Sequence, residues 1–133
     1  MVADLWTGMS NSKRETVPTT RELLEEYYRG LSKKGAWGHL LSEDFLLSGT
    51  VTQEIKGRDI YVNNNFFKLV KGLKVKELMA SGEKAFALVN YDLVSPKGKS
   101  FSSEVVEFWR AKDGELVSVA IYFDTAAFSR FMA

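Results

Sequence analysis

From Leu73 to Phe123 the apolar residues recur at every second position. Four segments with this pattern, KVKELMAS, KAFALVNYDLVS, SFSSEVVEFWRA and ELVSVAIYF, are separated by the turn signals Gly82-Glu83, Pro96-Lys97-Gly98 and Asp113-Gly114. A period of two is typical of β-strands, and connections this short join antiparallel neighbours. The second half of the chain therefore predicts a four-stranded antiparallel meander.

Before this meander, the apolar residues mostly follow a helical period. A first helix is predicted from Thr19 or Thr20, either of which can cap it, to Gly35, which ends it. Its apolar face comprises Leu23, Leu24, Tyr27, Tyr28 and Leu31. A short second helix is predicted over 36–45, a strand and turn over 45–55, and a third helix over 58–72 that the run 63–65 of asparagines kinks or exposes.

This order of elements predicts an α+β fold, with about three helices on one side of a curved antiparallel sheet. We expect the helices to close over an apolar pocket of ligand size, because the 13% of aromatic residues can both fill a core and line a concave site. The chain divides into a flexible tail over 1–17 and a single domain over 18–133. The last ten residues are expected to add no element, although Phe128 and Phe131 can pack over an edge of the sheet.

Composition narrows the classes of function. Lys and Arg total 18 and Asp and Glu total 17, so no strong field attracts nucleic acid or an anionic membrane. The sequence has no Cys and a single His, His39, which excludes thiolate and multi-histidine metal sites. We find no signal peptide, membrane span or cofactor-binding motif, and therefore expect a cytoplasmic protein without a tightly bound cofactor or metal.

Three stretches resemble the nuclear transport factor 2-like superfamily, in particular its SnoaL-like and ketosteroid-isomerase-related branch. They are YYRGLSKKGAWGHLLSEDF, KGRDIYVNNNFF and KDGELVSVAIYFDTAAF, and the resemblance covers about residues 19–130. It implies a cystatin-like cone that admits a small apolar or carbonyl-containing ligand at its wide end. It also implies a homodimer formed across the outer face of the sheet.

The resemblance also suggests site residues. Tyr28 lies seven residues before Gly35, the spacing of the isomerases' oxyanion-hole tyrosine, so its phenol is a candidate donor to a ligand carbonyl. The position of the isomerases' carboxylate base is here Gly49, and an acidic position of related cyclases is here Ile121. Neither residue can transfer a proton. Asp124 is interpreted as a structural cap, His39 as a structural or rim residue, and Tyr122 as facing outward.

Glu107 is the remaining candidate acid or base. On a strand it shares a face with Val105 and Trp109; if that face is inward, desolvation raises its pKa, and otherwise it lies in solvent or an interface. On the preceding strand, Asn90 and Asp92 share one face and Tyr91 lies on the other, and the sequence leaves open which face points inward. The expected pocket residues are Tyr28, Trp37, Phe66, Val105, Glu107, Trp109 and Ile121.

Two functions follow. The favoured one is non-catalytic binding of a small apolar molecule, because acids are missing at both usual positions. The alternative is an isomerase or polyketide-cyclase-type enzyme with Glu107 as acid or base and Tyr28 as oxyanion donor.

Overall fold

A computed structural model of the protein describes residues 17–133. The predicted tail over 1–17 lies almost wholly outside this range. The described elements, in chain order, are α1 (Thr20–Ser32), the 3-10 turn η2 (Gly38–Leu40), β2 (Leu41–Gly49), β3 (Ile55–Lys56), α2 (Arg58–Val62), α3 (Phe66–Leu69), β4 (Val70–Ser81), β5 (Lys84–Val94), β6 (Ser100–Lys112), β7 (Glu115–Tyr122) and α4 (Thr125–Met132).

Helix α1 begins and packs as its sequence predicts. The Thr19 side chain accepts a hydrogen bond from the backbone N–H of Glu22, and the Glu22 carboxylate accepts one from the backbone N–H of Thr19, which completes a capping box. The predicted apolar face is buried, and it holds Tyr27 and Tyr28 against the sheet. This helix therefore carries two phenols into the interior.

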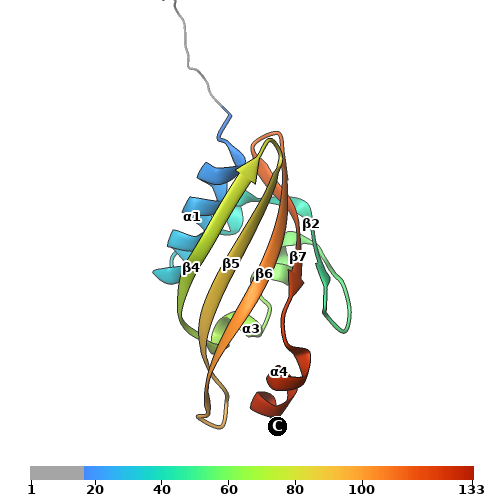
Figure 1. Cartoon of the computed structure of the whole chain (residues 1–133). Coiled ribbons are helices and arrows are strands. Elements are labelled where there is room, and N and C mark those ends of the chain that lie inside the picture. Colours follow the sequence, from blue (N-terminus) through green and yellow to red (C-terminus); the bar gives the residue numbers. More distant parts are fainter. Residues whose placement is uncertain (1–16) are drawn as a thin grey trace, which may run out of the picture.

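The six-stranded sheet has the order β3-β2-β7-β6-β5-β4. The predicted meander of β4 to β7 is confirmed, and all its pairs are antiparallel. The sheet as a whole is mixed, because β2 and β7 are neighbours that run parallel. The chain between them crosses over and forms the other strands of the sheet. Figure 1 shows the long strands β4, β5 and β6 side by side, with α1 behind their upper part and α4 at the lower end.

The first half departs from prediction in two places. The helix expected over 36–45 is only the turn η2, because the chain continues from Leu41 as strand β2, in which Leu41, Phe45 and Leu47 are buried. The helix expected over 58–72 is two short helices, α2 and α3. Asn64 interrupts it, since its Oδ1 accepts a hydrogen bond from the backbone N–H of Phe66 at 2.8 Å.

The expectation that the last ten residues add no element is wrong, because they form α4. Asp124 caps this helix, its Oδ1 accepting from the backbone N–H of Ala127 at 2.9 Å, as the cap interpretation predicts. Phe131 is buried and stacks on Phe101 of β6, with ring centroids 5.0 Å apart. The helix therefore closes one end of the sheet. Within residues 17–133, no helix is long and apolar enough to cross a membrane.

Candidate ligand-binding site

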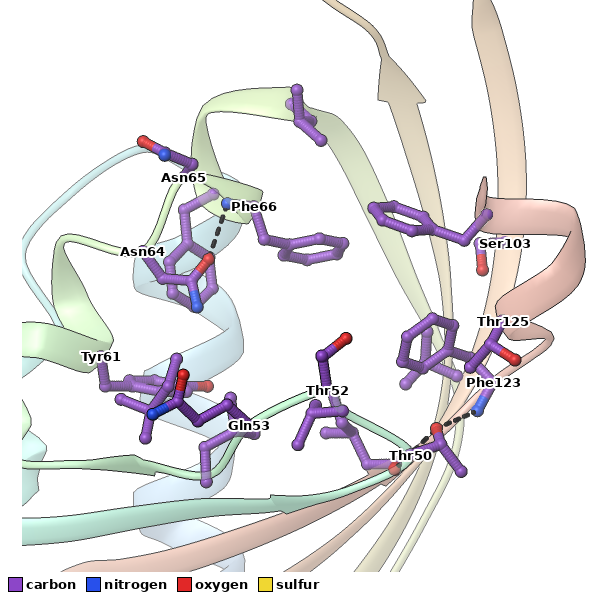
Figure 2. Close-up of a pocket in the computed structure, with 18 of the residues that line it drawn as sticks. Thr50, Thr52, Gln53, Tyr61, Asn64, Asn65, Phe66, Ser103, Phe123 and Thr125 are labelled. Carbon is purple, nitrogen blue, oxygen red and sulfur yellow. Dashed lines mark hydrogen bonds between the residues drawn. The ribbon is translucent and has the colours of Figure 1, made fainter. Parts of the chain in front are cut away.

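A cavity of about 1000 Å³ lies between the inner face of the sheet and the segments that cover it. Strands β5, β6 and β7 form its base, and its mouth is bordered by the β2–β3 loop, by α2 and α3, and by α4. Figure 2 shows Phe66, Phe123 and Ser103 around the open space, with Thr52 and Gln53 on the loop side. The walls are largely apolar, with Phe66, Phe67, Val105, Ile121, Phe123 and Phe128 among the lining residues.

Strand parity places Glu107 at the inner end of this cavity. Val105, Glu107 and Trp109 are buried on the inner face of β6, and Glu107 is only 6% exposed. The residue opposite Glu107 on β5 is Ala87, and the one opposite on β7 is Ile121. The phenol of Tyr28 on α1 reaches the carboxylate from the helical side.

Both oxygens of the Glu107 carboxylate accept hydrogen bonds from phenols. Tyr28 donates to Oε1 at 2.5 Å, and Tyr91 donates to Oε2 at 2.6 Å. The indole Nε1–H of Trp109 donates in turn to the hydroxyl oxygen of Tyr28 at 3.0 Å. A second phenol pair, Tyr27 and Tyr61, is joined by a hydrogen bond of 2.8 Å beside this network. Elements from the start, middle and end of the chain therefore converge on one carboxyl group.

Burial sets the protonation of this cluster. It raises the pKa of Glu107, an effect that the hydrogen bonds from Tyr28, Tyr91 and Trp109 only partly oppose. Within residues 17–133, no Lys, Arg or His forms an ion pair with Glu107. Burial likewise raises the pKa of Tyr28 and of Tyr91, so both phenols keep their protons at neutral pH. Among the residues that the structure describes, Glu107 is thus a buried acid whose hydrogen-bond donors are all neutral.

The residues expected in the pocket occupy two layers. Phe66, Val105, Glu107 and Ile121 line the cavity. Tyr28, Trp37 and Trp109 lie behind it in the core, where the Trp37 ring packs edge-on against Tyr27 and Phe67. The second layer supports the first instead of bordering the space where a ligand would lie.

Tyr91 and Tyr61 both line the cavity. From the sequence alone, the direction of Tyr91 stayed open and Tyr61 was not considered. A signal for Tyr91 was present in the sequence. The β5–β6 turn is centred on Lys97, which places Tyr91 opposite Ser103 and gives odd-numbered residues of both strands the same face. An inward Glu107 therefore requires an inward Tyr91, with Asn90 and Asp92 on the outer face. Tyr61 lies on a helix of only five residues, too short to show a periodicity.

The other candidate positions take no part in the hydrogen bonds to Glu107. His39 is exposed, with its Nε2 3.6 Å from Glu26 Oε2, and Tyr122 faces outward with 47% of its surface exposed. Gly49 ends β2 with φ of +104°, and a Cβ built there would lie 2.1 Å from the carbonyl oxygen of Ile121. Among residues 17–133, no three acidic, His or Cys side chains are grouped so that they could hold a metal ion.

A scan against protein-family models and a search of curated proteins find no match to this sequence. Solved structures do match. They include an NTF2-like protein from Burkholderia thailandensis with 18% identity and a TM-score of 0.77, over 87% of this chain and 98% of that one. A candidate SnoaL-like polyketide cyclase from Jannaschia sp. CCS1 has 14% identity and a TM-score of 0.72, over 92% and 97%. TerC, co-crystallised with polyporic acid, has 15% identity and a TM-score of 0.70, over 84% and 95%.

These likenesses extend over nearly the whole of each matched chain, and they confirm the fold that the sequence motifs suggested. At such identities they concern the fold alone. The chain has the α+β cone fold of the NTF2-like and SnoaL-like proteins.

Proposed function

We propose that the protein binds a small, largely apolar molecule in the cavity, with an oxygen of that molecule directed at the inner polar cluster. The observation that carries this proposal is the position of Glu107, a buried acid that lines an apolar cavity and has no cationic partner among residues 17–133. Burying an ionisable group is costly, and such groups are concentrated at functional sites.

The size and lining of the cavity support this proposal. Sites for small molecules have volumes of roughly 300 to 1000 Å³, apolar and aromatic walls, and a few polar groups that fix orientation. The cavity here lies at the upper end of that range and contains Glu107, Tyr91 and Ser103 at its base. TerC, of the same fold, was crystallised with polyporic acid, which supports a small organic ligand here.

Proton transfer at a carbon next to a carbonyl group is a second candidate function. The raised pKa of Glu107 favours it, because a carboxyl group poised nearer to neutral pH can exchange a proton with a bound ligand. The residues at the usual family positions, Gly49 and Ile121, cannot replace it in this role. Glu107 would therefore act alone as the acid or base.

Binding is tested with acetylnaphthalene, an apolar aromatic ketone, by NMR titration of the wild type and two variants. Ile121→Trp places an indole inside the cavity and is expected to weaken binding at least tenfold. Tyr122→Trp introduces the same indole at the next residue, which faces outward, and is expected to leave the affinity unchanged. Equal affinity for all three proteins, or no binding to the wild type, would argue against the cavity as the site.

The same samples in D₂O test the second function. A proton-transfer enzyme exchanges the methyl protons of the bound ketone for deuterium, and Glu107→Gln abolishes this exchange while ketone binding persists. Exchange in the wild type no faster than in buffer would leave binding as the function.

We further propose that the outer face of the sheet forms a homodimer. Met79, Phe86 and Phe108 lie opposite one another on β4, β5 and β6, and Met79 and Phe86 are exposed. The residue opposite Phe108 on β7 is Ala120, and Tyr122, two residues further along the same face of β7, is also exposed. Exposed apolar patches of this kind mark interfaces. Phe86→Glu is expected to convert the dimer to a monomer in analytical ultracentrifugation, and a monomeric wild type would refute this proposal.

A further inference from the structure

The two phenols that hold Glu107 are not equivalent. The hydroxyl of Tyr28 is used twice, since it donates to Glu107 Oε1 and its oxygen accepts from Trp109. Within residues 17–133, the hydroxyl of Tyr91 makes one hydrogen bond, to Glu107 Oε2. A phenol oxygen can also accept a hydrogen bond, so Tyr91 keeps an acceptor site that Tyr28 has filled.

The two phenols also differ in position, because only Tyr91 borders the cavity. Tyr91 and Glu107 line the cavity, whereas Tyr28 and Trp109 lie behind it. The ring of Tyr91 is held at the cavity wall, because Phe66 packs edge-on against it with centroids 5.4 Å apart. A reorientation of the Tyr91 O–H bond needs no movement of this ring.

We propose that Tyr91, rather than Tyr28, is the residue that donates a hydrogen bond to a carbonyl oxygen of the bound ligand, and that it does so when Glu107 is protonated. In this state the proton lies on Oε2 and is donated to the Tyr91 oxygen. The Tyr91 O–H then turns from the carboxyl group towards the cavity. Tyr28 stays fixed as a donor to Oε1, because Trp109 occupies its oxygen.

This inference rests on the proposed function, and it assigns a ligand class: an apolar molecule with a hydrogen-bond acceptor at its inner end. Tyr28 and Trp109 become positioning residues, which direct the proton to the Oε2 side. The other ionisable groups near Glu107 are Tyr27 on α1 and Tyr61 on α2, both kept neutral by burial. The charged groups that line the cavity, Glu54, Lys56 and Lys68, are exposed.

The experiment compares two probes of nearly the same shape. Acetylnaphthalene carries the acceptor, and isopropylnaphthalene replaces its carbonyl oxygen with a methyl group. Tyr91→Phe is expected to weaken binding of the ketone about tenfold, which corresponds to about 1.4 kcal/mol. The affinity of the same variant for the hydrocarbon is expected to stay within about twofold of the wild-type value. Tyr28→Phe is expected to change the affinities for the two probes by the same factor.

The ratio of the affinity for the ketone to the affinity for the hydrocarbon separates a direct contact from a structural effect, because a distorted cavity weakens the binding of both probes alike. In the wild type this ratio is also expected to fall as pH rises through the pKa of Glu107, since ionised Glu107 holds the Tyr91 proton. The inference is overturned if Tyr91→Phe leaves the ratio unchanged, or if Tyr28→Phe is the variant that alters it. In either case the binding proposal stands. If neither probe binds the wild type, both proposals fail together.

Discussion

Gly49→Asp, which introduces a carboxylate at the position that the resemblance matched to the isomerases' base, is expected to destabilise the protein by about 3 to 4 kcal/mol. Gly49 has φ of +104°, a conformation that costs a residue with a Cβ about 1–3 kcal/mol. The new Cβ would also lie 2.1 Å from the Ile121 carbonyl oxygen and 2.6 Å from its amide nitrogen. Relieving this overlap moves β2 away from β7 where the two strands pair.

This movement would lengthen the hydrogen bond that the backbone N–H of Thr50 donates to the carbonyl oxygen of Ile121, which is 2.8 Å long. Urea denaturation of the variant gives the loss of stability directly. Gly98→Asp is the matched control, because Gly98 also has a positive φ, of +85°, but a Cβ built there meets no atom of residues 17–133 within 4 Å. This control should lose only about 1 kcal/mol, as expected for an exposed turn residue. A Gly49→Asp variant as stable as the control would show that the backbone adapts there.

The second expected result is that the contribution of Glu107 to stability falls as pH rises. Burial raises the pKa of Glu107 above its usual 4.5, so the folded protein binds this proton more tightly than the unfolded chain. The contribution of Glu107 to stability is therefore complete below pH 4.5 and is lost as pH rises through the folded pKa. Each unit by which the pKa is raised corresponds to about 1.4 kcal/mol of stability lost.

Denaturation of the wild type and of Glu107→Gln across pH 4 to 9 measures this effect, because the other carboxylates contribute equally to both proteins. The free energy of unfolding of the wild type should fall relative to that of the variant as pH rises. Glu115→Gln removes the same charge from an exposed position and controls for net charge. A difference between wild type and Glu107→Gln that rises with pH would mean that the phenols outweigh burial and stabilise the ionised form.

The sequence predicted the fold best where one period continued for many residues. The alternation after Leu73 and the apolar face of α1 each repeat often enough to identify the element. The segment over 36–45 was misread because Trp37, Leu40 and Leu41 fit a helical spacing over too few residues. Only the pairing of β2 with β7, which brings together distant parts of the chain, shows that Leu41 and Phe45 lie in a strand.

The candidate site could be predicted only in part for the same reason. The shared face of Val105, Glu107 and Trp109 follows from strand geometry, whereas its inward direction depends on the packing of the whole sheet. The hydrogen bond from Tyr28 to Glu107 joins residues 79 positions apart, and that from Trp109 to Tyr28 joins residues 81 apart. No local pattern records contacts of this range. The hydrogen bond from Trp109 to the hydroxyl of Tyr28 is therefore seen only in the folded protein.

The cavity is built from two parts of the chain with different tolerance of change. Its polar base lies on the central strands β5 and β6, where Tyr91 and Glu107 are each paired with residues of both neighbouring strands. Its mouth is made by the β2–β3 loop, two short helices and α4, and such connecting and terminal segments accept substitutions and changes of length more readily. The mouth of the cavity can therefore change in size and shape between related chains while the buried carboxyl group at its base stays in place.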